Sequence, residues 1–329
     1  MTKVTQLAVL EEFNLLILLS DKVLIAYHLD VVCPPTGPSI PQADASVRKA
    51  PQKLSGSKDV GFFLAGKMKD RVLVFYQKRD GINSIFKILE PVLQRAATSR
   101  SRWLGNSSRR GQTEFFREYD EFYIPAETYG LNMFQSSLAV ATKKGMEVLT
   151  LDKKITWGVP NLESQSQDTS TRQHLDSIGQ RLKDVRPLGM FRLSEAEFLV
   201  VFSECAVYVN KLGDVSRSVI MEFVGRANTA CLYHPYLILF NDDFVEIRDA
   251  QSGRLKQVVT GQSIRMLDDG GNATPGVAGG PASLGGGANG LGVQGYGAIK
   301  RTVKLAMIHP EYERSYVVVE LVLKSDEQR

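Results

Sequence analysis

The chain has 329 residues, of which 43% are hydrophobic, and a formal net charge of +4 at pH 7. This hydrophobic content is ample for a buried core, whereas the mild charge, without a clustered basic face, gives no case for nucleic-acid binding. The most apolar N-terminal stretch, residues 7–29, is broken by Glu11, Glu12, Asp21 and Lys22, which excludes a membrane-spanning helix there, and no signal peptide is visible.

Short apolar runs joined by tight polar turns recur along the chain and predict β-hairpins. A strand is predicted at Val4–Leu10, before the first hairpin. The later runs Phe198–Phe202 and Tyr236–Phe240 show no polar alternation, so both predict strands that are buried on both faces. In chain order, the hairpins are predicted at residues 15–27, 73–89, 138–151, 198–214 and 236–248, with half of a further one at residues 315–323.

The spacing of the hairpins predicts an all-β fold of the β-propeller class. The runs at Phe198 and Tyr236 begin 38 residues apart, and four-stranded propeller blades repeat every ~40–45 residues. The longer intervals each contain a polar or glycine-rich insertion, and about six hairpin positions are visible. Further strands are predicted to complete the blades at residues 60–64, 118–124, 131–134, 155–159, 185–192, 220–224, 229–233 and 301–309.

We expect a single propeller domain over residues 1–329. Prolines prevent regular strand pairing in an insertion near residues 33–58. An insertion near residues 269–299 is a glycine-rich tether. The insertion near residues 161–184 is polar, with a helical turn predicted near His174–Ile178. Flexible insertions are predicted near residues 33–58, 94–112, 161–184 and 269–299.

The second insertion is rich in arginine, and Pro91–Gln112 contains no acidic residue. One interpretation is a solvated, disordered insertion. The other is a segment that contacts anionic lipid or is regulated by phosphorylation, because a phosphate would cancel the local positive charge. The residues of this candidate regulatory or anionic-contact loop are Arg95, Thr98, Arg100, Ser101, Arg102, Arg109 and Arg110.

The three cysteines favour a reducing compartment. Their number is odd, and Cys205 and Cys231 lie inside apolar runs, whereas Cys33 does not. Thiols in such runs predict buried, reduced side chains, so a cytoplasmic location is expected.

The sequence contains no recognisable catalytic, metal or cofactor site. The histidines are scattered without metal-ligand spacing, and the glycine-rich stretch lacks the Lys-Ser/Thr pair and the strand–helix context of a phosphate-binding loop. Asp242-Asp243 lies in a predicted hairpin turn, where Asp is favoured and where adjacent side chains point apart, which suits acid–base catalysis poorly. We therefore expect no catalytic residue, no metal and no cofactor. A propeller enzyme would need a cluster of carboxylates or histidines in its central funnel.

One turn is typical of the last two strands of a WD-type blade. In Ile247–Arg254, Asp249 can bind its own backbone and Gly253 can adopt a positive φ. The Trp-Asp dipeptide of such blades is absent.

Several separated segments resemble, in order, the citron homology (CNH) domain found at the C-terminus of fungal Rho guanine-nucleotide exchange factors. They are PLGMFRLSEAEFLVVFSECAVYVNKLGDVSR and YHPYLILFNDDFVEIRDAQSGRLKQVV within Arg186–Asp268, EFYIPAETYGLNMFQSSLAVATKKGMEVLTLD at Glu121–Asp152, and MIHPEYERSYVVVELVL at Met307–Leu323. The resemblance implies a seven-bladed propeller, so the six visible hairpins raise the expectation of a missing first blade.

The resemblance also implies a function. The implied role of this chain is that of a non-catalytic propeller for protein–protein interaction or regulation. The whole protein would activate a Rho GTPase in cell-wall-integrity signalling. Its nucleotide exchange would be performed by a Dbl-homology domain that is absent from this chain. The implied partners are a Rho-family small GTPase, other domains of the exchange factor, or a sensor or scaffold at the plasma membrane. A cytoplasmic protein recruited to the plasma membrane at sites of polarised growth is expected. The alternative is a CNH propeller of a vacuolar tethering subunit or of a kinase regulatory tail.

Overall fold

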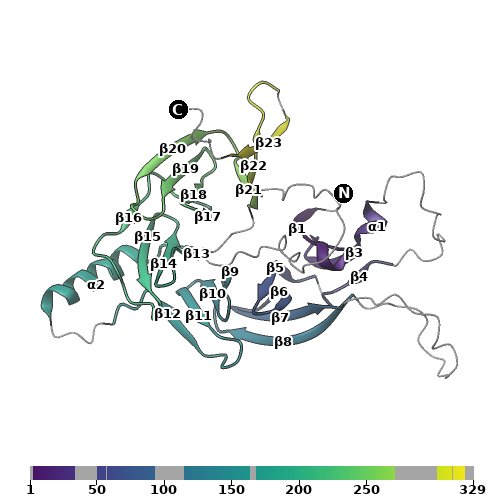
Figure 1. Ribbon diagram of the computed structural model, residues 1–329, viewed down its shortest axis with the longest axis horizontal. Helices are drawn as coiled ribbons and strands as arrows, with labels where there is room; N and C mark the ends of the chain where they lie inside the picture. The colour runs from purple at the N-terminus through teal and green to yellow at the C-terminus, as the bar shows by residue number, and fades with distance from the viewer. Residues whose placement is uncertain are drawn as a thin grey trace, which may run out of the picture. The chain divides into compact units, whose positions relative to one another are not determined.

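The computed structural model describes residues 3–33, 50–56, 58–92, 115–163, 168–270, 302–312 and 314–322. These residues form six sheets, each built from strands that follow one another in the chain (Figure 1). Five sheets have four strands and one has three. The chain comprises two compact units, which are described separately: unit 1 contains Met1–Thr128, Met133–Ser137 and Leu151–Lys154, and unit 2 contains Tyr129–Asn132, Leu138–Thr150 and Ile155–Arg329.

Unit 1 contains two antiparallel sheets whose facing sides share one core. Alternate residues of β2, among them Ile17 and Leu19, pack in one cluster with Val74 and Tyr76 of β6. A short 3-10 helix, Glu11–Phe13, joins the first two strands, and a four-residue helix, α1 (Leu29–Val32), follows the third. The strands are β1 (Val4–Leu10), β2 (Leu15–Ser20), β3 (Val23–His28) and β4 (Gln52–Lys53) in one sheet, and β5 (Val60–Met68), β6 (Arg71–Asp80), β7 (Asn83–Pro91) and β8 (Phe116–Ile124) in the other.

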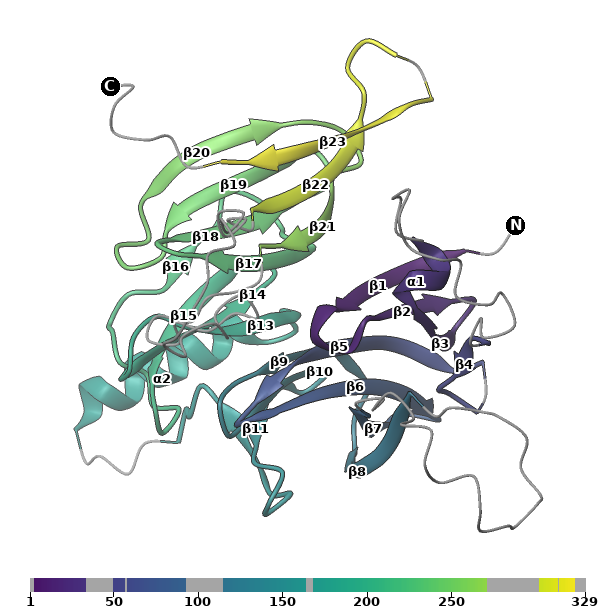
Figure 2. The same ribbon diagram turned by 45° about the vertical axis from the view of Figure 1, so that its right-hand side comes forward.

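Unit 2 contains the remaining four sheets and the 14-residue helix α2 (Thr169–Leu182). Figure 2 shows the strands of β17–β20 lying side by side, with the three-stranded sheet β21–β23 next to them. The strands are β9 (Thr128–Met133), β10 (Leu138–Thr142), β11 (Gly145–Leu149), β12 (Thr156–Val159); β13 (Pro187–Arg192), β14 (Glu197–Phe202), β15 (Cys205–Asn210), β16 (Met221–Glu222); β17 (Thr229–Tyr233), β18 (Tyr236–Phe240), β19 (Phe244–Asp249), β20 (Leu255–Thr260); and β21 (Arg265–Asp269), β22 (Val303–Ile308), β23 (Tyr316–Leu321).

The central strands lack alternation because each of their faces packs against a different sheet. In β18, Leu237 and Leu239 share a cluster with Leu199 and Val201 of the preceding sheet. The intervening Ile238 and Phe240 instead share a cluster with the β21–β23 sheet that follows. Both predicted core runs are thus buried on both faces, from Leu199 to Phe202 and from Leu237 to Phe240. Consecutive antiparallel sheets stacked in this way are propeller blades, so the predicted fold class is confirmed.

The structure differs from the sequence-based prediction at several elements. Residues 169–182, expected within a polar loop with a single helical turn, form the whole of α2. The first predicted insertion contains β4, and β21 was not predicted at all. The six sheets of the described residues match the number of hairpins visible in the sequence, one fewer than the seven blades implied by the resemblance.

Candidate functional site

The predicted basic loop lies between β7 and β8, outside the residues that the structure describes. Its role as an anionic contact or regulatory segment therefore stays a prediction. The residues concerned are Arg95, Thr98, Arg100, Ser101, Arg102, Arg109 and Arg110.

Two of the histidines make local polar contacts. Nδ1 of His28 lies 3.2 Å from a carboxylate oxygen of Asp30, and Nε2 of His234 lies 3.3 Å from the carbonyl oxygen of Arg192. Nowhere in the described ranges do three or more His, Cys, Asp or Glu side chains form a group that could hold a metal ion. No helix in these ranges is long and apolar enough to cross a membrane.

The two buried thiols offer no reactive centre. Cys205 and Cys231 are buried and free, as predicted, and Cys33 is exposed and free. Burial raises the pKa of Cys205 to about 12, and it raises the pKa of Cys231 as well. Both thiols therefore stay protonated near neutral pH, where a nucleophile would need to be a thiolate.

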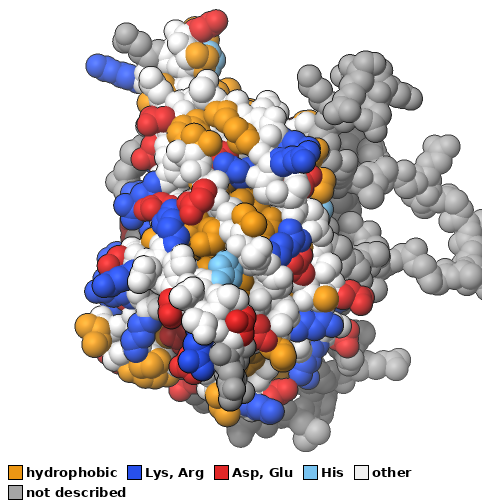
Figure 3. All heavy atoms as spheres, turned by 90° about the vertical axis from the view of Figure 1, so that its left-hand side faces the viewer, with side chains coloured by type: hydrophobic (Ala, Val, Ile, Leu, Met, Phe, Trp, Pro, Cys, Tyr) orange, Lys and Arg blue, Asp and Glu red, His pale blue; other side chains and the backbone are white. Residues whose placement is uncertain are grey.

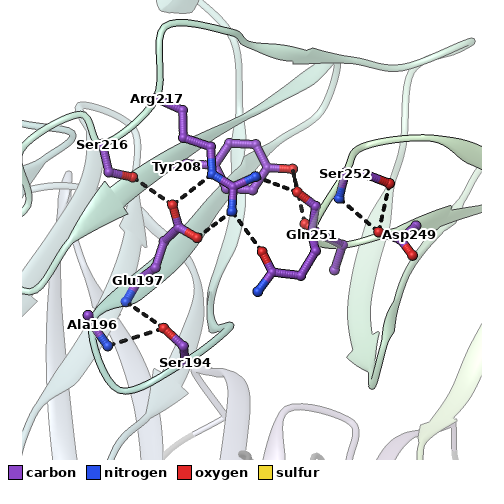
Figure 4. Close-up of polar contacts among 10 residues, drawn as sticks. Ser194, Ala196, Glu197, Tyr208, Ser216, Arg217, Asp249, Gln251 and Ser252 are labelled. Atoms are coloured by element: carbon purple, nitrogen blue, oxygen red, sulfur yellow. Dashed lines mark hydrogen bonds and ion pairs between the residues drawn. The ribbon is translucent and has the colours of Figure 1, made fainter.

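The most developed polar constellation is the Arg217 cluster, which we define as Glu197, Tyr208, Ser216, Arg217 and Gln251 (Figure 4). Nε of Arg217 donates to Oε1 of Glu197 at 2.8 Å, and Nη2 donates to Oε1 of Gln251 at 2.7 Å. The guanidinium lies 3.7 Å from the centre of the Tyr208 ring. Ser216 completes the cluster by donating its hydroxyl to Glu197 at 2.9 Å.

Local structure brings Arg217 to this position. At the end of β15, the side-chain oxygen of Asn210 accepts hydrogen bonds from the backbone N–H groups of Leu212 and Asp214, at 2.8 and 3.0 Å. Gly213 takes a φ of +90°, which turns the chain back so that Val215 forms a bridge with β15. The residues that follow this turn therefore run back beside β15, where Tyr208 lies.

The Arg217 cluster joins two neighbouring sheets. Glu197 and Tyr208 belong to β14 and β15, whereas Gln251 follows β19. The Tyr208 hydroxyl donates to the carbonyl oxygen of Ala250 at 3.0 Å. The bonds to Ala250 and Gln251 hold the turn of one blade against the blade before it.

The pKa shifts in the cluster indicate a structural role, because they stabilise the ordinary charge state of each group. The hydrogen bond from Arg217 lowers the pKa of Glu197, and the same bond raises the pKa of Arg217. Burial raises the pKa of Tyr208. Each group is thus held in its ordinary charge state near neutral pH, so none is poised for proton transfer.

The turn that Gln251 occupies has the geometry predicted from the sequence. Oδ1 of Asp249 accepts hydrogen bonds from the backbone N–H and the hydroxyl of Ser252, both at 2.8 Å. Gly253 has a φ of +71°. These bonds, visible in Figure 4, also lower the pKa of Asp249.

A buried charge pair lies on the same sheet. Glu246 is 1% exposed and accepts a hydrogen bond from the backbone N–H of Val224 at 3.0 Å. Nε of Arg248 also donates to it, and Nη1 of Arg248 donates to the carbonyl oxygen of Gly253 at 2.7 Å. The pair ties the β16–β17 connection and the Asp249–Gly253 turn to strand β19.

Helix α2 is attached to its sheet near its C-terminal end. Nη2 of Arg181 lies 2.8 Å from Oε2 of Glu222, and Nη1 lies 3.3 Å from Oε2 of Glu204. Ile178 is the buried residue of the helix. At the other end, Asp168 caps the helix, and the hydrogen bonds it receives, first of all from the Thr171 hydroxyl, lower its pKa to about 2.

The outer surface is mixed in character. Figure 3 shows a face on which apolar side chains lie among lysines, arginines, aspartates and glutamates, with neither sign of charge dominating. Such a mixture is ordinary for a surface that contacts proteins and differs from the basic stripe of a nucleic-acid interface. Exposed large apolar side chains of unit 2 include Leu212, Val219, Val224, Leu255 and Val258.

The Asp249–Gly253 turn was predicted from the sequence, whereas the Arg217 cluster and the buried Glu246 were not. A turn is encoded by neighbouring residues, so its signal is local. Arg217 and Gln251 are 34 residues apart and meet only once the two sheets have packed. No pattern in the sequence marks such a pair.

Replacing Arg217 with Ala is expected to lower the free energy of unfolding by about 1–3 kcal/mol, the range for a buried polar group that loses its partner, because the Glu197 carboxylate then keeps only the hydrogen bond from Ser216. Arg217→Lys should recover only part of the loss, since an ammonium cannot reproduce the bidentate bond. Urea unfolding followed by circular dichroism measures the free energy of unfolding of both variants. Equal stability of Arg217→Ala and the unsubstituted chain would contradict this structural role.

Residues 1–270 match the family model of the CNH domain. The chain is 32% identical over 269 residues to Rho1 guanine nucleotide exchange factor 1 of Schizosaccharomyces pombe, covering 81% of this chain and 19% of that protein. It is 28% identical over 328 residues to Rho1 guanine nucleotide exchange factor 3 of the same yeast, covering 97% and 22%. RHO1 GDP-GTP exchange protein 2 of Saccharomyces cerevisiae is 25% identical over 266 residues, with 80% and 18% covered.

The chain thus spans about a fifth of the length of these curated relatives. Among solved structures, the AfRom2 CNH domain superposes with a TM-score of 0.67 at 27% sequence identity, covering 98% of this chain and 81% of that one.

Proposed function

Because this chain belongs to the CNH domain family, we propose that it is the non-catalytic interaction module of a Rho guanine-nucleotide exchange factor that acts in cell-wall-integrity signalling. The observation that carries the proposal is the match of residues 1–270 to the family together with 32% identity to a yeast Rho1 exchange factor. The resemblance inferred from the sequence is confirmed by the same findings. Matches to exchange factors favour this role over a vacuolar tether or a kinase tail.

The structure supports a docking role in a specific way. Stacked sheets bury the central strands, and side-chain bonds such as those of the Arg217 cluster hold the connecting turns in place. Rigid scaffolds that carry varied loops commonly bind partners through those loops. We place a Rho-family GTPase, the other domains of the exchange factor, or a plasma-membrane sensor among the partners, and we place the protein in the cytoplasm, recruited to the membrane at sites of polarised growth.

The proposal assigns nucleotide exchange to a Dbl-homology domain outside residues 1–329. Among the described residues, α2 is the only helix longer than four residues, so nothing there resembles the helical bundle of such a domain. The contribution of these residues is instead recruitment or regulation.

This chain alone is therefore expected not to accelerate release of a fluorescent guanine nucleotide from a Rho-type GTPase. A full-length exchange factor that contains the domain serves as the positive control. Stimulation by the isolated chain comparable to that control would overturn the non-catalytic assignment.

Deleting the domain from the full-length factor should impair its recruitment or regulation in cells more than its intrinsic exchange rate. Localisation of the tagged factor and exchange by the purified factor separate the two effects. Loss of exchange with normal localisation would contradict the proposal.

A further inference from the structure

Ser194 lies in the turn between β13 and β14, with Arg192 before it and Glu195 and Glu197 after it. Its hydroxyl oxygen accepts hydrogen bonds from the backbone N–H groups of Ala196 and Glu197, at 3.2 and 3.1 Å (Figure 4). Glu195 and Glu197 occupy the first and third positions after it, and no other serine of the chain has carboxylates at both positions. Protein kinases select substrates partly by such charge patterns.

Arg192 is placed to receive a phosphate at this turn. Its Nε donates to the carbonyl oxygen of Ser194 at 3.0 Å, which anchors the guanidinium beside the serine. Within the described residues, its two terminal nitrogens make no hydrogen bond or ion pair. Arginine binds phosphate through paired N–H groups, and consecutive backbone N–H groups also favour anions.

We propose that Ser194 is a phosphorylation site for a Ser/Thr protein kinase that recognises acidic residues after the acceptor, and that Arg192 binds the resulting phosphate. In the transfer, Oγ of Ser194 forms a bond to the γ-phosphorus of ATP while the bond from that phosphorus to the bridging oxygen of ADP breaks. The hydroxyl proton passes to the catalytic base of the kinase, and ADP leaves.

A phosphate on Ser194 would affect residues that contact the neighbouring sheet. A phosphoserine carries about −1.5 to −2 charges at pH 7, and the modified hydroxyl accepts a hydrogen bond from the backbone N–H of Glu197, the residue whose carboxylate binds Arg217. Arg217 in turn holds Gln251 of the next blade. Modification of Ser194 would therefore act on the contact between two blades, which goes beyond the docking role proposed above.

The first test uses the purified chain with magnesium ATP and an acidophilic casein kinase, followed by peptide mass spectrometry. We expect phosphate on Ser194, its retention in Ser194→Thr, and its loss from this site in Ser194→Ala. Glu195→Gln should slow the reaction several-fold, because Glu195 is exposed and available to the kinase, whereas Glu311→Gln on a different turn should not. Absence of phosphate from Ser194, or modification only in heat-unfolded protein, would overturn the proposal.

The second test isolates Arg192. A phosphorus NMR titration of the phosphorylated chain reports the second pKa of the phosphoserine, which is ordinarily about 6. Arg192→Gln should raise this pKa, since it removes a cation that favours the dianion, and Arg192→Lys should raise it less. Lys143→Gln, on the β10–β11 turn, is the control. The same titration curve in Arg192→Gln and the unsubstituted chain would show that Arg192 does not bind the phosphate.

Discussion

Replacing Val201 with Asp is expected to yield insoluble or unfolded protein. Val201 is 0% exposed and lies in a core cluster with Leu199 and, from the next sheet, Leu237 and Leu239. A carboxylate placed there has no cation or hydrogen-bond donor, and burying such a charge costs several kcal/mol. That cost approaches the whole stability of a typical domain, about 5–15 kcal/mol.

The matched control is Val219→Asp, because Val219 is 69% exposed and its substitution should leave solubility and the thermal midpoint nearly unchanged. Soluble yield and thermal unfolding followed by circular dichroism measure both variants. A soluble Val201→Asp protein with an unchanged midpoint would show that β14 does not pack on both faces.

Replacing Glu246 with Ala should cost about 3–5 kcal/mol of the free energy of unfolding, the range for removing one partner of a buried ion pair. The substitution leaves the Arg248 guanidinium and the Val224 N–H group without the carboxylate that they bind. Urea unfolding measures the loss. Glu195→Ala is the control, since Glu195 is exposed and should change stability by no more than about 0.5 kcal/mol.

The loss has two causes, the buried charge left on Arg248 and the hydrogen bond lost by the Val224 N–H group, and a double variant separates them. Glu246→Leu with Arg248→Met replaces both charges by apolar side chains, and such replacements are often neutral or stabilising. We therefore expect it to be more stable than Glu246→Ala alone. If the double variant is as unstable as the single one, the buried charge left on Arg248 is not the source of the loss.

The hairpins could be predicted from the sequence because their signals are local. The run Tyr236–Phe240 and the strand Thr229–Tyr233 were predicted with the bounds that the structure shows. Apolar, β-branched runs bounded by polar turns favour strands without reference to distant residues. The Asp249–Gly253 turn was found for the same reason.

Helix α2 was missed because its sequence is polar and only Ile178 is buried, so it shows little of the apolar periodicity that marks a helix. Its one clear local signal was the capping residue Asp168, followed by Ser170 and Thr171, which donate backbone N–H groups to its carboxylate. Strands β4 and β21 carry no comparable signal, because β4 has two residues and β21 is exposed over most of its length.

The sequence by itself determined the core strands, which depend on residues within one segment, and the fold class and the family, which depend on the order and spacing of such segments along the chain. Only the tertiary structure decided which residues form the Arg217 cluster, that Glu246 is buried beside Arg248, and that Nε of Arg192 donates to the Ser194 carbonyl while its terminal nitrogens meet no partner among the residues that the structure describes. Apolar burial is non-directional and tolerates approximate placement. Hydrogen bonds and ion pairs require atoms within about 3 Å in a defined orientation, and that placement arises only when sheets distant in sequence have packed.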